Sequence, residues 1–464
     1  MKGIRLLSIF LAAVLVFTLL VGCAEKGNSS TTTATTTTAV SSASASTPEE
    51  PKQPTGKVIF WTAWAADRGP GKWIEQFNEK YPDITVEHIN FPNDKEGNIK
   101  LDVALLAGQE VDVCFNYGVE RFAPRASKGL YEDLTPYLEK DKIDIPSEFS
   151  INTYKYQDKY YGLPNGAISD VVIINLDLLK EKNIPMPSPD WTYDDYLDIS
   201  RRLTVPGNPR IYGTCDFMNK DYWTMGARGV LGSNAWYNKD GLSNFDHPTY
   251  KQALDLRYKM EIEEEIMFPN LEIWANKAST TDLFLQGRIA MYMSSSSAVR
   301  SLADLENFPR DFKVAFFPYP KLTKDQPENY MRGLRLFDYL SMSAKSANKD
   351  AAWEFMKWLS TEGSVGLAQV GHMPTWKKSD KDAVIKTIIK PEAIETFDID
   401  SIKKYLVDYE SPCYADSEFI AYAQIMTLIQ EAQDKVLTKT LTVDDALEEL
   451  KKKADEVILQ EKEK

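Results

Sequence analysis

The chain has 464 residues, of which 43% are hydrophobic and 26% charged, a balance typical of a soluble globular protein with two or three domains. It carries 54 Lys and Arg against 68 Asp and Glu, which gives a formal net charge of −14. This acidic balance argues against a nucleic acid as partner and against non-specific binding to an anionic membrane surface.

Residues 1–22 have the pattern of an export signal. Lys2 and Arg5 provide a positively charged start, Leu6–Val21 is mostly apolar, and the small residue Gly22 offers a cleavage site. The apolar run has 16 residues, fewer than the roughly 20 that a helix needs to cross a bilayer. We therefore expect a cleaved signal peptide, with a short membrane anchor as the alternative.

Cys23 stands between the apolar run and a Ser/Thr-rich tract. The sequence LVGC that it ends resembles the bacterial lipobox, which implies that Cys23 is diacylated and becomes the first residue after cleavage. Residues 24–56 have almost no large apolar side chains and are predicted to form a flexible tether. We expect Cys23 and this tether to hold the body on the outer face of the cell membrane, with a plain secretory signal as the simpler alternative.

The remaining cysteines do not suggest a metal site or a disulfide framework. Cys114, Cys215 and Cys413 are an odd number with wide spacing, and the chain has no CxxC motif and no Cys/His cluster. Cys114, in VDVCF, is expected to be a buried small hydrophobic residue. No cofactor is predicted.

From Val58 onward the chain alternates strand and helix patterns. Strands are predicted in VIFW (58–61), ITVEHINF (84–91), VDVCF (111–115), Val171–Ile174, FKVAFFPYPKL (312–322) and LFDYLSMSAK (336–345). Helices are predicted around Trp73–Tyr81, around Ile99–Leu106, after the capping pair Thr192 and Asp195, in AAWEFMKWLS (351–360), and after Thr442 with one face formed by Val443, Leu447, Leu450, Ala454 and Val457. This alternation predicts an α/β fold with a mostly parallel, helix-covered sheet.

An ordered set of motifs resembles one known family. The motifs are VIFWTAW, WIEQFNEKYPDITVE, LDVALLAGQEVDVCF, ASKGLYEDLTPYL, YYGLPNGAISDVVIINLDLLKEKNI, WTYDDYLDISRRLT, FLQGRIAMYMSSSSAV, AAWEFMKWLST and LTVDDALEELKKKADEVI. Together they resemble the extracellular solute-binding proteins of sugar ABC transporters, the class that includes maltose-binding proteins. The resemblance runs from about Val58 to Ile458.

The resemblance implies a two-lobed, periplasmic-binding-protein-like α/β fold, with hinge strands and a ligand cleft between the lobes. The N-terminal lobe is expected to contain residues 57–165 and 318–365. The C-terminal lobe is expected to contain residues 166–317 and 366–464. The candidate hinges are Leu163–Ser169 and Ala315–Pro320.

Two loops of the N-terminal lobe resemble the ligand loops of the family. Sugar sites combine flat aromatic rings, which pack on the C–H face of a sugar, with polar groups that pair with its hydroxyls. In WTAWAADRG the candidates are Trp64, Asp67 and Arg68. In CFNYGVERF the candidates are Asn116, Tyr117, Glu120 and Arg121. The simpler alternatives are a surface loop and a charge pair at a helix start.

In the C-terminal lobe the resemblance points to Tyr222 and Trp223 in KDYW (220–223), with the core as the alternative place for Trp223 and Trp236 as a weaker candidate. The family strand that often ends in a cleft Trp has Ser297 at that position. The segment CYADSEFIAY (413–422) also lacks the Trp of maltose-binding members. The loss of two stacking rings argues against maltodextrin specificity, and Asp416 or Glu418 is expected to supply hydrogen bonds instead.

The leading hypothesis is a monomeric substrate-binding lipoprotein that captures a mono- or oligosaccharide and delivers it to a membrane permease, without catalysis. Two other hypotheses stay open: an exported glycoside hydrolase with two catalytic carboxylates, and the same fold with a polyol, a sugar phosphate or another solute as ligand. The chain has no GxSxG, HExxH or P-loop motif. His88, His247 and His372 are isolated in the sequence and are expected to be structural.

Overall fold

The structure is a computed structural model that describes residues 54–108, 110–151, 153–216, 222–326, 334–408 and 416–463. These residues belong to one compact unit of the chain. The signal segment, Cys23, most of the tether, Lys220, Asp221 and Cys413 lie outside them. None of the helices in the described ranges is both long enough and apolar enough to cross a membrane.

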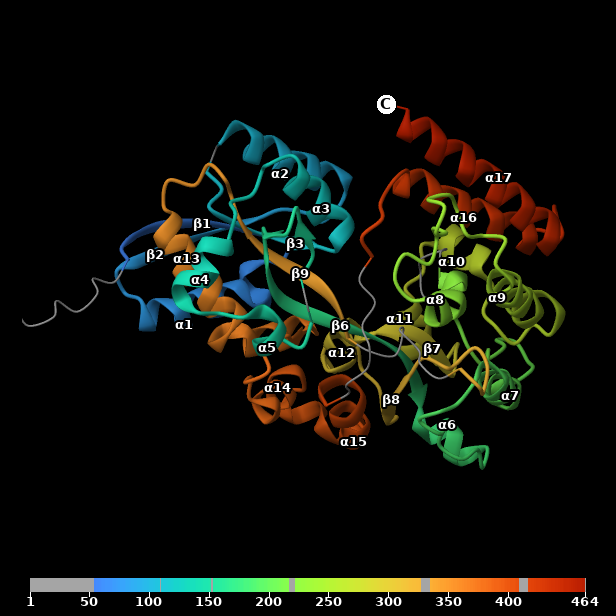
Figure 1. Cartoon of the computed structure of the whole chain (residues 1–464). Coiled ribbons are helices and arrows are strands. Elements are labelled where there is room, and N and C mark those ends of the chain that lie inside the picture. Colours follow the sequence, from blue (N-terminus) through green and yellow to red (C-terminus); the bar gives the residue numbers. More distant parts are fainter. Residues whose placement is uncertain are drawn as a thin grey trace, which may run out of the picture. The chain divides into compact units, whose positions relative to one another are not determined.

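The strands follow the sequence prediction closely (Figure 1). They are β1 (Gly56–Thr62), β2 (Ile84–Asn90), β3 (Val113–Tyr117), β4 (Lys155–Tyr156), β5 (Lys159–Tyr160), β6 (Leu163–Asn175), β7 (Met291–Ser295), β8 (Val314–Pro318), β9 (Leu334–Met342) and β10 (Met373–Pro374).

Helices connect these strands and pack around them. The α-helices are α1 (Pro70–Lys80), α2 (Lys95–Ala107), α3 (Val119–Ser127), α4 (Thr135–Asp141), α5 (Ile145–Glu148), α6 (Leu176–Glu181), α7 (Tyr193–Leu203), α8 (Met225–Leu231), α9 (Pro248–Tyr258), α10 (Asn270–Asn276), α11 (Thr280–Leu285), α12 (Val299–Leu302), α13 (Lys349–Ser360), α14 (Lys381–Ile388), α15 (Ile399–Ile402), α16 (Tyr422–Leu437) and α17 (Val443–Lys462). Three 3-10 helices matter for the site: η1 (Ala66–Arg68), η4 (Ser296–Ala298) and η6 (Glu362–Val370).

The first lobe is built on a mixed sheet with the strand order β10-β6-β9-β3-β1-β2. β1 pairs in parallel with β2 and β3, whereas β9 runs antiparallel to both β3 and β6. The prediction of a mostly parallel sheet is therefore wrong, because every pairing that involves β6 or β9 is antiparallel. One hydrophobic core, with Val58, Phe60, Phe115, Leu340 and Phe355 at its centre, collects residues from 58–163 and from 339–370. We call this core and the elements around it the first lobe.

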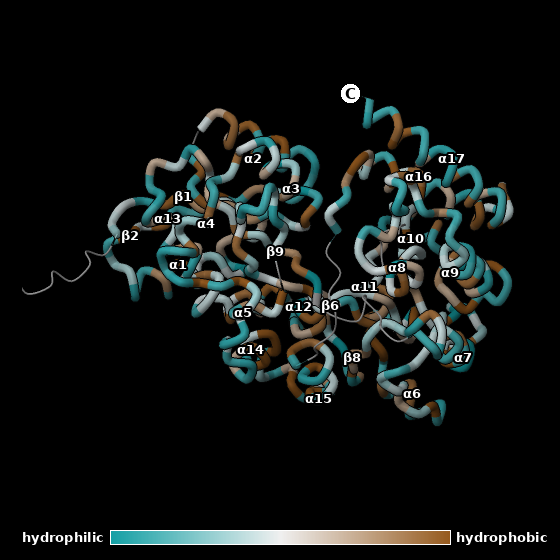
Figure 2. Tube along the Cα trace, in the orientation of Figure 1, coloured by the Kyte–Doolittle hydropathy of each residue, from teal (hydrophilic) through white to brown (hydrophobic). Residues whose placement is uncertain are grey.

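The second lobe is built on the second half of β6. There β6 pairs antiparallel with β7 and with β8, one on each side. Successive residues of a strand point to opposite faces, so Val171 and Ile173 enter one hydrophobic core while Val172 and Ile174 enter another. A further cluster joins α9, α16 and α17. Polar and apolar residues alternate along α17 as expected for a helix with one buried face (Figure 2).

The passage between the lobes differs from the prediction in one place. β6 passes from the first core to the second over the predicted hinge Leu163–Ser169. The prediction of a second hinge at Ala315–Pro320 is wrong, because this segment is largely β8, which pairs with Val171–Asn175 inside the second lobe. The second crossing is β9 instead, which pairs with both β6 and β3. Residues 318–326, predicted in the N-terminal lobe, therefore pack in the second lobe, where Tyr319 is buried.

The helix predictions show which features a sequence pattern determines and which it does not. Thr192 and Asp195 form the predicted capping box, and Thr442 caps α17 through its side chain. α2 forms where expected, but Ile99, Val103 and Leu106 are exposed and other residues of α2 face the core. Their helical spacing fits either face of α2, so the spacing identifies the helix without identifying its buried side.

Candidate functional site

Trp64, a predicted ligand residue, lies in the loop after β1. It is partly buried, and its ring lies close to perpendicular to the rings of Trp73, Phe115, Tyr117 and His372, at centroid distances of 5.1 to 5.7 Å. Perpendicular contacts of this kind stabilise aromatic pairs. Four such neighbours hold the plane of the Trp64 ring in place before any ligand binds.

Tyr117, at the end of β3, supports this loop from the interior. Its hydroxyl accepts a hydrogen bond from the backbone N–H of Ala63 and lies 2.7 Å from the hydroxyl of Thr62. Burial raises the pKa of the Tyr117 phenol well above its ordinary value, so the group stays protonated. Tyr117 thus holds the loop from the interior and packs against the Trp64 ring.

Asp67 and Arg68 lie in η1, where both side chains are exposed. Neither makes an ion pair with another residue of the described ranges. Because η1 comes directly after the loop that holds Trp64, a carboxylate and a guanidinium stand close in the chain to a fixed ring.

Arg300, in α12 of the second lobe, lies within electrostatic reach of Arg68 of the first. Withdrawal from water, and to a smaller extent the positive charge of Arg68, lowers the pKa of the Arg300 guanidinium. Its side chain is nevertheless exposed. Two arginines from different lobes therefore lie near one another, and the sequence motifs had singled out only Arg68.

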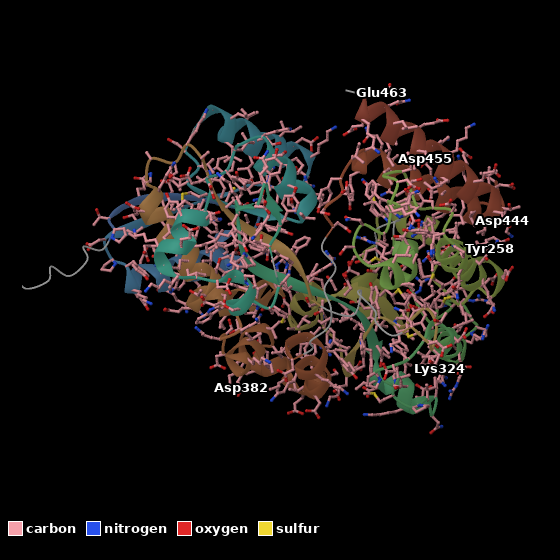
Figure 3. All side chains as sticks on the ribbon, viewed as in Figure 1. Tyr258, Lys324, Asp382, Asp444, Asp455 and Glu463 are labelled. Atoms are coloured by element: carbon pink, nitrogen blue, oxygen red, sulfur yellow. The ribbon has the colours of Figure 1, made fainter. Side chains whose placement is uncertain are left out.

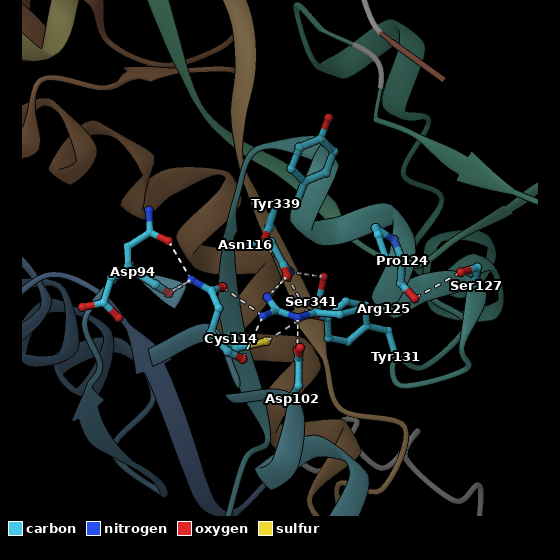
Figure 4. Close-up of polar contacts among 12 residues, drawn as sticks. Asp94, Asp102, Cys114, Asn116, Pro124, Arg125, Ser127, Tyr131, Tyr339 and Ser341 are labelled. Carbon is cyan, nitrogen blue, oxygen red and sulfur yellow. Dashed lines mark hydrogen bonds and ion pairs between the residues drawn. The ribbon is translucent and has the colours of Figure 1, made fainter. Parts of the chain in front are cut away.

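Asn116 is not in a position to contact a ligand, contrary to the prediction. It is fully buried in the first lobe, where its amide oxygen accepts hydrogen bonds from Arg125 at 2.8 Å and Tyr131 at 2.6 Å (Figure 4). Its amide nitrogen donates to the hydroxyl of Ser341 at 3.1 Å. A polar residue inside a strand that is covered on both faces looks like a ligand residue in the sequence, although its partners are internal.

Glu120 and Arg121 lie in the first turn of α3. The side chain of Glu120 is exposed, yet the surrounding protein raises its pKa by desolvation. A backbone hydrogen bond and the positive charges of Arg121 and Arg335 act to lower this pKa, whereas the negative charge of Asp416 adds to the increase. The charges that act on Glu120 therefore come from both lobes.

Tyr222 and Trp223 are both buried in the second lobe. They line a cavity of about 30 Å³ together with Asp216 and Arg257, a volume that holds roughly one water molecule. The indole N–H of Trp223 donates to the carbonyl of Ile429. The structure therefore places both residues in or against the core and does not bring them to the group around Trp64.

Ser297 and Asp416 complete the candidates from the second lobe. Ser297, in η4, is partly exposed, and its hydroxyl lies 2.6 Å from that of Ser295. Asp416 pairs with Arg228 at 2.9 Å and accepts a hydrogen bond from the backbone of Asn234. Trp236 is buried and stacks on Tyr422, which removes it from the candidate list.

Two buried acids on β6 and β9, the strands that pass between the lobes, were not identified from the sequence motifs. Asp170 accepts two hydrogen bonds from the guanidinium of Arg335, at 2.8 and 3.2 Å. Asp338, fully buried in β9, lies 2.5 Å from Nδ1 of His372. A charged residue inside the apolar stretch LFDYL was the one available signal for Asp338. Its partner, 34 residues away, could not be identified from sequence spacing.

Among the described residues, no group of three or more His, Cys, Asp or Glu side chains could hold a metal ion. Cys114 and Cys215 are buried free thiols, and burial raises the pKa of Cys114 to about 11. The candidate residues offer aromatic rings, charged groups and hydroxyls to a ligand.

Known proteins resemble this chain over most of its length. The profile of the family described as bacterial extracellular solute-binding protein matches residues 62–365. The chain is 27% identical to a maltotriose-binding protein of Pyrococcus abyssi over 72% of its length and 69% of that protein. It is 26% identical to a galactooligosaccharide-binding protein of Bacillus subtilis over 78% of each chain.

A solved structure has the same fold. The sugar-binding protein MalE from Xanthomonas citri superposes with a TM-score of 0.68 at 18% identity, over 88% of this chain and 98% of that one. This confirms the predicted two-lobed α/β fold. With the family profile covering well over half of the chain, the protein belongs to the bacterial extracellular solute-binding proteins.

Proposed function

We propose that the chain captures a mono- or oligosaccharide between its two lobes and delivers it to the permease of an ABC transporter. One observation carries the proposal: a partly exposed ring with a fixed plane, Trp64, lies in the same loop region as Asp67 and Arg68, and Arg300 approaches from the other lobe. Sugars need this combination of a flat apolar surface and charged hydrogen-bonding groups.

The relatives support the class of ligand. The proteins of Pyrococcus abyssi, Bacillus subtilis and Xanthomonas citri are named for maltotriose, galactooligosaccharide and sugar binding. Their common feature is an uncharged, polyhydroxylated ligand. We extend that feature to this chain, without a choice among the individual sugars.

We assign ligand contact to residues from both lobes. The proposed contacts are Trp64, Asp67, Arg68, Glu120, Arg121, Ser297, Asp416 and Arg300. Tyr117 supports Trp64, and Asn116, Tyr222 and Trp223 are left out because they are buried. A ligand that touches both lobes binds the closed arrangement more tightly than the open one, so binding shifts the population toward closure about β6 and β9. The permease would then recognise the closed form.

The test is calorimetric titration with four probes: maltotriose, a galactooligosaccharide, an arabinooligosaccharide and sn-glycerol 3-phosphate. We expect at least one saccharide to bind with one site per chain, and Trp64→Ala to weaken it by about tenfold, which corresponds to roughly 1.4 kcal/mol. Trp274→Ala is the matched control, because Trp274 is an exposed tryptophan of α10. A folded protein that binds none of the saccharides would contradict the proposal.

We also propose that the chain binds without catalysis. The neighbouring family members are binding proteins. Long incubation with the bound oligosaccharide should leave it intact by chromatography. Shortened products that persist in a repurified sample, and disappear when Glu120 and Asp67 are replaced by their amides, would favour the glycoside hydrolase.

The lipid anchor at Cys23 is part of the proposal. Expression in a bacterial host with a radiolabelled fatty acid should label the chain and place it in the membrane fraction. Cys23→Ala should lose both the label and the membrane association, whereas Cys413→Ser should keep them. Equal labelling of the two variants would contradict acylation at Cys23.

A further inference from the structure

The pair formed by Asp338 and His372 lies where β6 and β9 pass between the lobes and where β10 pairs with β6. Asp338 is on β9, opposite Gly166 of β6. His372 directly precedes β10, which pairs with β6 at Gly166 and Ala167. A Cβ atom at Gly166 would lie 2.1 Å from Oδ2 of Asp338, so only glycine leaves room for this carboxylate. The pair is therefore enclosed by all three segments.

The ring of His372 is held in one orientation. Its Nδ1 lies 2.5 Å from Oδ2 of Asp338, and the ring is close to perpendicular to Trp64 at 5.2 Å and to Phe337 at 5.5 Å. The Asp338 carboxylate accepts the hydrogen of Nδ1, and an imidazole that carries its single hydrogen on Nδ1 presents Nε2 as an acceptor. Nε2 has no hydrogen-bond partner in the part of the chain that the structure describes.

His372 also stands between the candidate residues of the two lobes. On one side it contacts Trp64. On the other, its neighbour Gly371 packs against η4: the carbonyl of Gly371 accepts a hydrogen bond from Ser296 at 3.0 Å, and a Cβ at Gly371 would lie 2.7 Å from Cα of Ser297. His372 is thus connected to Trp64 by a ring contact and to η4 through its chain neighbour Gly371.

We propose that His372 is a ligand-binding residue, whose Nε2 accepts a hydrogen bond from a hydroxyl of the saccharide on Trp64, and that Asp338 is the positioning residue that fixes its tautomer. The inference rests on the proposed function and adds to it a specific contact at the floor of the site. The alternative explanation is that the pair only stabilises the contact between β9 and the segment before β10.

The main test is the double variant His372→Phe with Asp338→Leu. It keeps a ring between Trp64 and Phe337 and replaces both polar partners, a change that is close to neutral for folding when shape is kept. We expect the affinity for the tightest-binding of the four titration probes to fall about tenfold. Unchanged affinity in a folded double variant would overturn the proposal.

Asp338→Asn provides the rescue. Its amide oxygen can still accept the hydrogen of Nδ1, so affinity should stay within about twofold of the unmodified protein, whereas Asp338→Leu alone should lose affinity. His247→Ala is the matched control: it removes a histidine that caps α9 in the second lobe, and we expect affinity to be unchanged even if the melting temperature falls. An equal loss in Asp338→Asn and Asp338→Leu would contradict the positioning role.

A second measurement does not depend on the folding of any variant. In ¹⁵N-labelled protein, the Nε2 resonance of His372 should shift when the saccharide saturates the site, because its lone pair gains a hydrogen bond. A resonance that stays in place while the protein binds sugar would overturn the contact and leave the proposed function intact. If none of the four probes binds the unmodified protein, the proposed function fails first and this inference with it.

Discussion

Each lobe contains a buried arginine that connects several segments, but the two arginines have partners of different charge. In the first lobe, Arg125 pairs with Asp102, which is 45% exposed, and with the neutral side-chain oxygens of Asn98 and Asn116 (Figure 4). In the second lobe, Arg257 lies between Asp216 and Glu261, both nearly enclosed. Removal of Arg257 would therefore leave two buried carboxylates without their cation. Removal of Arg125 would leave one carboxylate that water can solvate.

The largest effect is expected for Arg257→Met. Removing one member of a buried ionic group leaves uncompensated charge, which costs about 3 to 5 kcal/mol of unfolding free energy. Urea denaturation at neutral pH would measure it. The triple variant Arg257→Met, Asp216→Asn, Glu261→Gln should recover much of the loss, because no buried charge then remains. A triple variant as unstable as the single one would mean that packing dominates.

Arg125→Met should be milder, at about 2 kcal/mol, the usual value for hydrogen bonds to a charged group. Asp102 can take up water, and Asn116 keeps its hydrogen bond from Tyr131. Urea denaturation at neutral pH would measure this loss of unfolding free energy. If Arg125→Met costs as much as Arg257→Met, the charge of the partners does not distinguish the lobes.

One partly buried carboxylate in each lobe should make stability sensitive to acid. Asp141 accepts hydrogen bonds from Lys357 and Trp353, and Asp455, labelled in Figure 3, accepts from Ser243 and Lys451. Burial acts to raise the pKa of each carboxyl, but these hydrogen bonds outweigh it, and each pKa lies below the ordinary value.

The sign of the pH effect follows from these lowered pKa values. The stabilisation is present above the unfolded-state pKa of about 3.9 and is lost as the pH falls through the lower folded-state pKa. Asp141→Asn and Asp455→Asn should each cost about 1 kcal/mol at pH 7 and progressively less toward pH 2. A cost that stays constant between pH 7 and pH 2 in denaturation series would show that ionisation is not its source.

These networks mark the limit of what the sequence predicts. Strand and helix alternation identified the α/β fold, and capping residues located the starts of α7 and α17, because such signals are local. Asp216, one of the two acids beside Arg257, lies 41 residues away from it, and His372 lies 34 residues from Asp338, so no local pattern relates these pairs. For the same reason Asn116 resembled a ligand residue until its internal partners were known.

The error at the second hinge has a similar cause. FKVAFFPYPKL is an apolar strand pattern, and such a pattern does not say which neighbour the strand pairs with. β8 pairs with β6 within the second lobe, whereas β9, with a charged residue in its centre, makes the crossing. Asp338, a charged residue inside an apolar strand pattern, is a sequence feature that sets β9 apart from β8.

The smallest effect is expected for the ion pair between Lys251 and Asp444, which sits on the surface of the second lobe (Figure 3). Its atoms are 2.7 Å apart, as close as those of Arg257 and Asp216, but the two side chains are 46% and 73% exposed. Water solvates both charges when the pair is broken, so Asp444→Asn should change the unfolding free energy by no more than about 0.5 kcal/mol, and added salt should erase the difference. A cost above about 1 kcal/mol that persists in high salt would require another role for Asp444, such as its place in the first turn of α17. Because the two pairs match in distance and differ strongly in burial, this variant shows how much proximity contributes to stability when the charges are not enclosed.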